Sequence, residues 1–315
     1  MANFNDLAAK MGDYFAEHKQ EIFTQLLVSP SLDDHFELEA NVADELATLN
    51  FSMEASAKNF KYEYTATDTQ KFTASKLKVR PGLIAEVIYP KEYYKTYLNQ
   101  ILKKVYTPEA IPFEKMITDE MIRVNLNGLR TKTIWKGVYD AAPATPTILT
   151  IFDGFEKHLL DGVTASTIVP LTAVGIPTEA NILDAVDEVI EGMSEEVKSQ
   201  PDVQVLLSAQ LFFWYLKAYK VANQAHLPER DAEGNIIYDL DPRIKIKSEK
   251  SLTAANSKRI LGSIRRNMQI GTSAANFENF NAIIHSHGLY FDILLEFEMG
   301  TQIPWPEYLT CNNAT

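Results

Sequence analysis

Two histidines separated by one residue, His285 and His287, form the most metal-like spacing in the sequence. On a strand they would share a face, because side chains alternate between the two faces. A zinc site needs further ligands, and the other histidines belong to separate segments: His18, His35, His158 and His226. We therefore expect a structural or solvated pair and predict no metal site.

Carboxylates are the next candidates for ligands or for acid–base groups. The turns at Asp153-Gly154 and Asp231–Gly234 resemble pieces of calcium loops, but the alternating acids and the terminal Glu of a complete loop are absent. Four further acids, spaced to share one helix face opposite an apolar stripe, are Asp184, Asp187, Glu188 and Glu191. General acid chemistry would require burial to shift a carboxyl pKa. We expect two ordinary turns and a solvated helix face.

The remaining reactive groups give no catalytic pattern. Cys311 is the single cysteine, so no internal disulfide is possible, and we interpret it as an incidental thiol rather than a nucleophile. No glycine-rich phosphate loop and no G-x-S-x-G motif occurs. The aromatic run Phe212–Tyr215 and the proline-flanked Trp305 favour core and interface roles over a ligand cage. The sequence predicts no catalytic residue, no cofactor-binding residue and no cofactor, and we do not expect an enzyme.

The composition predicts a folded protein without a membrane segment. The chain has 315 residues, 46% of them hydrophobic, which suits one large domain or two closely packed ones and excludes general disorder. No window approaches the roughly 20 apolar residues of a bilayer span. The first residues lack the pattern of a signal peptide, so we expect the chain to stay in the cytoplasm where it is made. A net charge of −12 argues against sequence-specific nucleic-acid binding.

The charge is unevenly distributed along the chain. Residues 1–50 contain ten acids against Lys10 and Lys19, whereas residues 243–266 contain eight basic residues against Glu249. Two interpretations stay open. The segments could be two solvated faces, or they could be complementary surfaces that meet between subunits.

The N-terminal quarter reads as an arm followed by a ribbon. Apolar residues recur every three to four positions over residues 5–27, which predicts an amphipathic helix that ends at Ser29-Pro30. Weak helical periodicity follows over Phe36–Leu49. Residues 50–90 are rich in Thr, Tyr, Phe and Val, and we interpret them as a long polar β-hairpin bounded by Pro81-Gly82 and Pro90. Neither piece has enough apolar surface for its own core, so both need a partner surface.

The rest of the chain mixes helices and strands. A short helix is predicted over Tyr93–Val105, and a second begins at Pro112 with Phe113, Ile117, Met121 and Val124 on one face and a kink or break near Asn127-Gly128. A helix over Thr178–Lys198 should bury Ile182, Val186, Val189, Ile190, Met193 and Val197. Val203–Leu207 reads as a strand, Ser208 as a helix N-cap, and FDILLEFEMGTQI as a closing hairpin. The fold class is α+β.

The ordered series of these segments resembles the major capsid proteins of tailed bacteriophages, particularly phages of Bacteroidetes-type hosts. EIFTQLL, KLKVRPG and IPFEKMI are similar to the N-terminal arm, the extended loop and the long spine helix of that family. DGFEKHL, ANILDAVDEVIEGM and LLSAQLFFWYLKAY are similar to the start of its axial domain. RNMQIGT and FDILLEFEMGTQI are similar to the return to its peripheral domain.

The resemblance implies the phage-capsid (Johnson) fold and a division of the chain. The arm would be 1–49, the extended β-hairpin loop 50–90, the peripheral domain with its spine helix 91–150, the axial domain 151–270 and the return to the peripheral domain 271–315. It further implies hexamers and pentamers in an icosahedral head, assembled in the host cytoplasm around double-stranded DNA that is contacted non-specifically. Scaffolding and portal proteins, and in some phages decoration proteins, would be the partners in the virion.

Two departures from the family pattern stay open, as do two alternative functions. Only some 50 residues precede the ribbon, so a scaffold is either a separate protein, which Met1 favours, or a removed pro-segment. Some members cross-link through a loop lysine, but nothing assigns that role to Lys58, Lys61, Lys71 or Lys76. The alternatives are an encapsulin-like cargo shell of the same fold, and a soluble enzyme or another virion structural protein.

Overall fold

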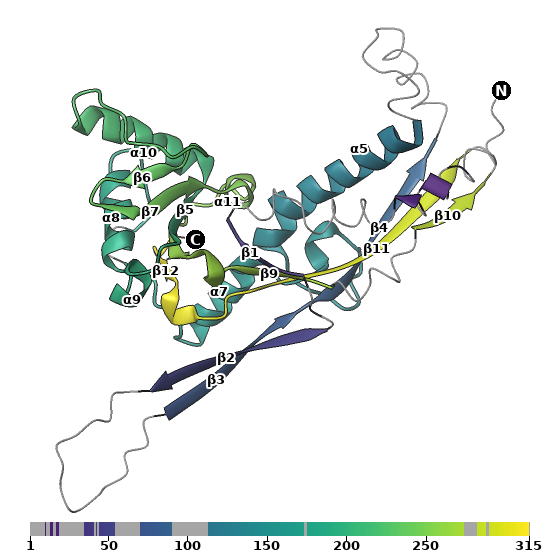
Figure 1. Cartoon of the computed structure of the whole chain (residues 1–315), viewed down its shortest axis with the longest axis horizontal. Coiled ribbons are helices and arrows are strands. Elements are labelled where there is room, and N and C mark those ends of the chain that lie inside the picture. The colour runs from purple at the N-terminus through teal and green to yellow at the C-terminus, as the bar shows by residue number, and fades with distance from the viewer. Residues whose placement is uncertain are drawn as a thin grey trace, which may run out of the picture.

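The computed structural model describes residues 10, 13–14, 17–18, 35–40, 42, 44–53, 70–89, 113–172, 175–273, 282–287 and 290–314. The predicted α+β class is confirmed, since these residues form two five-stranded sheets, a two-stranded ribbon and helices in mixed order. Figure 1 shows a lobe built on one sheet, an elongated part built on the other, and the ribbon extending away from both. In the described part of the chain, no helix is long and apolar enough to span a bilayer.

The first sheet is organised around one long strand, β11 (Phe291–Gln302). It pairs antiparallel with β4 (Arg80–Ile88), β10 (Ala282–Ser286) and β9 (Gln269–Thr272), and β9 pairs in parallel with β1 (Glu37–Glu39). The segment FDILLEFEMGTQI is therefore one strand, and the prediction that it forms a hairpin by itself is wrong. It pairs antiparallel with β10, the strand that precedes it. Its buried apolar residues alternate from Ile293 to Met299, which fits one continuous strand.

A long helix, α5 (Phe113–Gly128), runs beside β4 and β11 in Figure 1 and contributes Ile117 and Met121 to their common core. Val124 is 51% exposed, so its predicted place on the buried face is wrong. The helix does not break at Gly128. It continues as a π-helical turn, η1 (Leu129–Thr133), into α6 (Ile134–Lys136). Further along are η2 (Ile148–Thr150) and α7 (Phe155–Thr164).

The second sheet has the order β12-β8-β5-β7-β6. Its strands are β5 (Val203–Leu207), β6 (Ile236–Tyr238), β7 (Asp241–Ser248), β8 (Leu261–Ile264) and β12 (Thr310–Cys311). The strand predicted over Val203–Leu207 is confirmed. The helix predicted over 178–198 is two helices, α8 (Ile182–Glu191) and α9 (Glu195–Lys198), but all six residues expected to face inward are buried.

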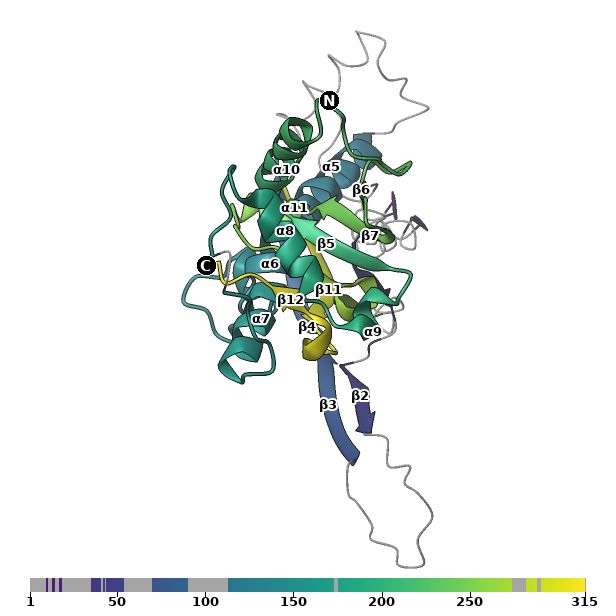
Figure 2. The same ribbon diagram turned by 90° about the vertical axis from the view of Figure 1, so that its left-hand side faces the viewer.

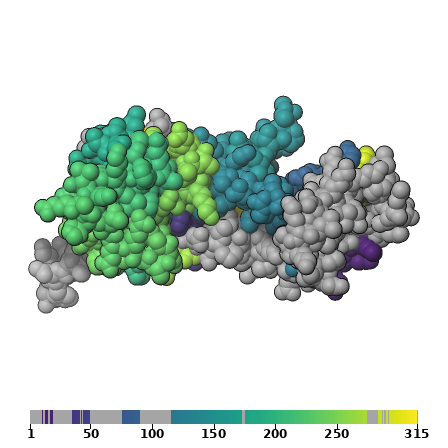
Figure 3. Space-filling model, turned by 90° about the horizontal axis from the view of Figure 1, so that it is seen from above, coloured from purple at the N-terminus to yellow at the C-terminus, as the bar shows by residue number. Residues whose placement is uncertain are grey.

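The two hydrophobic cores meet at β5. Val203, Val205 and Leu207 belong to the core beneath α8 and α10 (Ala209–Ala222), whereas Leu206 belongs to the core of the first sheet. A strand alternates its side chains between two faces, so a strand that is apolar at nearly every position can serve two cores. Figure 3 shows the rounded lobe that carries α8 and α10 standing beside the elongated part.

The ribbon consists of β2 (Glu45–Met53) and β3 (Gln70–Lys78), paired antiparallel from Glu45↔Lys78 to Met53↔Gln70. Figures 1 and 2 show it projecting away from the lobes. A hairpin in this region is confirmed, but its limits differ from the prediction. The helix predicted over Phe36–Leu49 is wrong, because those residues supply β1 and the start of β2.

Pro81 and Gly82 do not bound the ribbon, since both lie inside β4, which is part of the first sheet. Proline is tolerated there because it is the second residue of β4, whose one partner among the named strands is β11. The predicted helix at 5–27 falls mostly outside the described residues, and the one at Tyr93–Val105 falls entirely outside them.

Candidate functional site: assembly elements and a buried polar cluster

The β2–β3 ribbon is anchored at its base, and its described exposed side chains include Glu45, Lys76 and Lys78 as well as Leu46. Leu77 is buried against Gly271 of β9, where an added Cβ would lie 2.8 Å from Leu77 Cδ2. Ser75 Oγ donates to the carbonyl of Pro304 at 3.1 Å. These contacts tie the base of the ribbon to the first sheet and to the residues that follow β11.

Lysines cross the ribbon to a single glutamate. Lys76 Nζ lies 2.9 Å and Lys78 Nζ 3.3 Å from the carboxylate of Glu45. The hydrogen bond from Lys76 lowers the pKa of the Glu45 carboxyl, with a smaller contribution from Lys78. The pairs are exposed, so they contribute little to the free energy of folding. They connect the two strands across the ribbon and favour the observed register.

A buried polar cluster joins three segments that are far apart in the sequence. Arg130 Nη2 donates to Glu249 Oε2 at 2.8 Å, Arg130 Nη1 donates to Glu249 Oε1, and His35 Nδ1 bonds Glu249 Oε2. The Arg130 and Glu249 side chains are only 2% and 1% exposed. The guanidinium also lies over the Phe36 ring, 4.8 Å from its centroid. The cluster links the end of the arm, the π-helical turn η1 and the start of α11 (Lys250–Ala254).

Both carboxylate oxygens of Glu249 accept hydrogen bonds, which explains how this carboxylate can be buried. As N-cap of α11 it also accepts hydrogen bonds from the Ser251 N–H and Oγ, each at 2.9 Å. Burial by itself would raise the pKa of the Glu249 carboxyl. The hydrogen bonds from His35 and Arg130 outweigh that effect and hold the pKa well below its ordinary value of 4.5. Glu249 is therefore charged at neutral pH.

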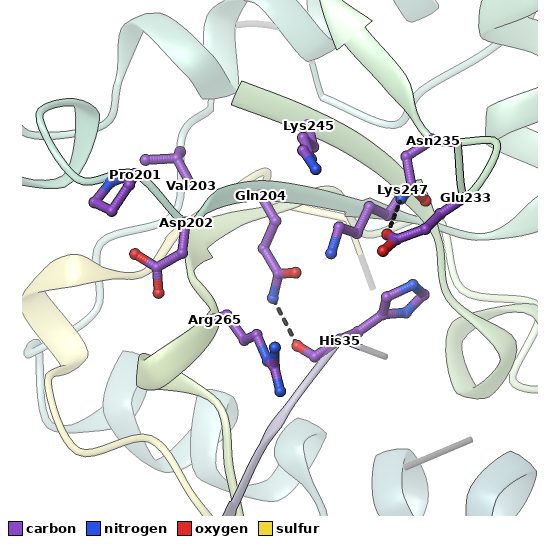
Figure 4. Close-up of a pocket in the computed structure, with 10 residues that line it drawn as sticks. All are labelled: His35, Pro201, Asp202, Val203, Gln204, Glu233, Asn235, Lys245, Lys247 and Arg265. Atoms are coloured by element: carbon purple, nitrogen blue, oxygen red, sulfur yellow. Dashed lines mark hydrogen bonds between the residues drawn. The ribbon is translucent and has the colours of Figure 1, made fainter. Parts of the chain in front are cut away.

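A polar cavity of about 580 Å³ lies next to His35, between β5, β7 and the residues that follow β8 (Figure 4). Gln204 Nε2 donates to the carbonyl of His35 at 2.8 Å across it. Lys245, Lys247 and Arg265 line the cavity together with Asp202 and Glu233. Burial lowers the pKa of the Lys247 ammonium, and the nearby Glu233 opposes that shift.

The acidic arm and the basic 243–266 segment touch within one chain at two described places, where His35 bonds Glu249 and where Arg265 contacts the two residues that follow His35. Arg265 Nε donates to the carbonyl of Phe36 at 3.1 Å and lies 3.7 Å from Glu37 Oε2. Lys245 pairs with Asp231 at 3.1 Å, and Arg243 pairs with Asp241 at 2.7 Å. Part of the basic segment is thus already neutralised inside the subunit. Contact between subunits stays a prediction.

The histidine pair and the predicted turns have local roles. His287 Nε2 bonds Asp292 at 2.9 Å and its ring stacks on Tyr290, while His285 is exposed. No group of three potential metal ligands exists among the described residues. Asp153 accepts from the Tyr139 N–H at 3.0 Å, and Asp231 accepts from the Glu233 and Asn235 N–H groups.

Two members of the acidic helix face, Asp187 and Glu188, are partly buried and not solvated as predicted. Asp187 is half-buried and accepts a hydrogen bond from the Tyr238 hydroxyl at 3.0 Å, because β6 packs beside α8. Burial raises the pKa of its carboxyl. Asp184 and Glu191 are exposed as expected. Cys311 is buried in the strand pair β12–β8, and burial raises the pKa of its thiol, which does not suit a nucleophile.

Sequence reasoning missed Arg130, Glu249 and the contact to His35. No local spacing relates Glu249 to the other two residues, since it lies 119 residues after Arg130 and 214 residues after His35. The nearest usable signal was Glu249 two residues before Ser251, which fits an N-cap. No pattern in the sequence connects it to the other two.

Comparisons with solved structures identify the fold. A chain of the satellite phage P4 procapsid that includes the size determination (Sid) protein matches with a TM-score of 0.60 and 11% identity, over 93% of this chain and 89% of that one. A chain of the capsid of Myoviridae phage XM1 matches with a TM-score of 0.54 and 10% identity, over 89% and 90%. No protein-family model and no curated protein matches the sequence. The chain therefore has the fold of phage capsid subunits, as its sequence predicted.

Proposed function

We propose that this chain is the major capsid protein of a tailed phage and that it self-assembles into an icosahedral head enclosing double-stranded DNA. The observation that carries the proposal is the match along nearly the whole chain to a subunit of a phage procapsid. A fold alone can serve several functions. Here the match extends over 93% of this chain and 89% of the other, so it is not confined to one domain that another protein could have borrowed.

The ribbon supports an assembly role. A two-stranded ribbon is marginally stable alone in water, and this one extends past the lobes while Leu77 at its base packs against the first sheet. Its crossed lysine–glutamate pairs are exposed in the subunit and are open to a neighbouring molecule. In a closed shell, that molecule is a neighbouring subunit.

The parts of the chain take the roles expected for a shell subunit. The first sheet with α5 is the peripheral domain with its spine helix, the second sheet with α8 and α10 is the axial domain, and the β2–β3 ribbon is the extended loop. The chain is a structural component of the virion and not an enzyme. Its partners are other copies of itself in hexamers and pentamers, a scaffolding protein and a portal.

The packaged DNA is contacted without sequence preference. A chain with net charge −12 has little capacity for the counterion release that drives tight DNA binding. A gel-shift titration near physiological salt should give weak binding that is the same for unrelated sequences. A nanomolar, sequence-specific complex would contradict the proposal.

Electron microscopy of the purified chain, alone and with its scaffolding protein, tests the proposal directly. We expect closed particles of uniform diameter. Sedimentation that gives only monomers or dimers under every assembly condition would refute it. The alternative of a cargo shell with the same fold predicts particles that enclose a protein, so nuclease-protected double-stranded DNA in particles from the native source distinguishes the two.

A further inference from the structure

The long helix changes its hydrogen-bonding pattern at one place. From Leu129 to Thr133 it is π-helical, and the N–H of Ile134 bonds the carbonyl of Leu129, five residues earlier. A π-helical turn holds one residue more than an α-helical turn, and such insertions are rare. Each residue of an α-helix turns the chain by about 100°. The inserted residue therefore sets which way every side chain of α6 points.

The π-helical turn carries Arg130, whose contacts depend on that geometry. Its guanidinium reaches Glu249 with two hydrogen bonds and covers the Phe36 ring at the same time. Phe36 is itself stacked on Phe155 of α7, with ring centroids 5.0 Å apart. Moving Arg130 by one helical position would break both contacts and leave a buried carboxylate with one charged partner fewer, which is costly.

The arm end completes the same cluster from the other side. His35 bonds Glu249, Glu37 N donates to the carbonyl of Met268 at 3.0 Å, and β1 pairs with β9. If the arm end left, Glu249 would lose one hydrogen bond and Arg130 would lose the ring beneath it. Of the cluster's contacts to the π-helical turn, the Arg130–Glu249 pair would remain, beside the packing of Leu129 and the hydrogen bond from Thr133 Oγ1 to the carbonyl of Ile148.

We propose that the arm end (His35–Glu39) and the π-helical turn (Leu129–Thr133) form one two-state element. With the arm end seated, Arg130, Glu249, His35 and Phe36 hold the inserted residue in the helix. With the arm end released, the turn relaxes toward regular α-helical bonding, which rotates α6 and the buried Trp135 relative to α5. Docking of the arm end is thereby coupled to the orientation of α6 relative to α5. This inference concerns the subunit itself and does not rest on the proposed function.

Native-state hydrogen exchange on the purified full-length chain tests the coupling without any substitution. The amide of Glu37 in the arm end donates to the carbonyl of Met268, and the amides of Ile134 and Gly137 donate to the carbonyls of Leu129 and Thr133 in the π-helical turn. Over a series of low urea concentrations, the arm amides and the turn amides should exchange through one common opening with the same urea dependence. Separate openings for the two segments would overturn the proposal.

Variants test the effect of the arm end on the π-helical turn and the effect of the turn on the arm end. His35→Ala should raise exchange at residues 129–134 by about tenfold or more and leave the central strand β5 protected. Deletion of the exposed Lys132, which removes the extra residue of the turn, should raise exchange and protease cleavage at residues 35–40. Arg123→Ala breaks an exposed pair with Glu120 on the same helix and is the matched control, with no change expected in either segment. Unchanged exchange at 129–134 in His35→Ala would overturn the proposal.

Discussion

Arg130 and Glu249 form a bidentate ion pair in the interior although 119 residues separate them. Glu249 begins α11 directly after the second sheet, and Arg130 lies in the helix beside the first. The pair is therefore a polar bond between the two halves of the molecule, in a region otherwise held by apolar packing. The pair stabilises the fold only when both partners are present, because either one alone would be a buried charge without a partner.

Removal of one partner should destabilise the subunit strongly. Arg130→Met or Glu249→Gln leaves a buried polar group without its charged partner, at a cost of about 3–5 kcal/mol. The double variant should lose clearly less than the sum of the single losses, because no unpaired charge remains. Urea unfolding of all four proteins gives the coupling energy. Arg123→Ala at the exposed pair with Glu120 should cost about 0–1 kcal/mol; additive losses at Arg130 and Glu249 would contradict the interpretation.

Acid should weaken this cluster in a predictable range of pH. The pKa of Glu249 is lower in the folded chain than its ordinary value of 4.5. The folded state thus holds the carboxylate charged, and the resulting stability is present above about pH 4.5 and is lost as the pH falls below it. The stability of wild type should drop over that range more steeply than that of Glu249→Gln. Glu195→Gln, at a side chain 91% exposed, should follow wild type.

The outer ribbon should be needed for assembly and not for folding. Replacing residues 49–74 by Asn-Gly joins the pair Thr48↔Ser75 through a two-residue turn and keeps Ser75, Leu77 and Val79. Loop closure changes by only about 0.6 kcal/mol per doubling of length. We expect cooperative melting by circular dichroism and no closed particles by electron microscopy.

A wider cut provides the contrast for that experiment. Deleting residues 56–84 would also remove Leu77, Val79 and Ile84, which are buried, and so should unfold the subunit. If the narrow replacement unfolds the chain, the ribbon belongs to the core. If it still forms shells, the ribbon is not the extended loop that joins subunits.

Two glycines of the first sheet should respond differently to the same substitution. A Cβ at Gly82 would lie 2.4 Å from Cζ of Phe297, whereas a Cβ at Gly300 would lie 1.9 Å from the backbone oxygen of Lys78. Gly82→Ala should cost about 1–3 kcal/mol through overpacking, and Phe297→Leu should rescue part of that loss. Gly300→Ala should cost more and should not be rescued by Phe297→Leu, because the clash is with backbone. Thermal unfolding of the single and double variants decides between these outcomes.

Charge reversal on the exposed part of the basic segment should weaken assembly. Lys250 and Arg266 are exposed, so Lys250→Glu with Arg266→Glu should leave the melting temperature within a few degrees of wild type. If this segment meets the acidic arm of a neighbour, particle yield should fall, and wild-type yield should also fall with added salt because exposed pairs are screened over roughly 8–10 Å. Lys217→Glu with Lys220→Glu on α10 is the matched control. Full particle yield from the Lys250/Arg266 variant would refute the contact between subunits.

Much of the fold could be predicted from local patterns. The buried stripe from Ile182 to Val197 and the strand Val203–Leu207 were predictable, since periodicity reports which side chains face a core. The order of the segments was enough to predict the phage-capsid fold. The helix predicted over Phe36–Leu49 failed because a three-residue strand and the start of a ribbon are too short and too polar to show the alternation of a strand.

The buried cluster and the π-helical turn were decided by the tertiary structure alone. Gly128 indicated that the helix is altered near that point, but only the pairing of Arg130 with Glu249 and the ring of Phe36 selects an inserted residue over a break. A charged residue in a sequence looks the same whether it is solvated or buried. Burial and pairing depend on segments that approach each other across 119 and 214 residues, and no spacing along the chain encodes that approach.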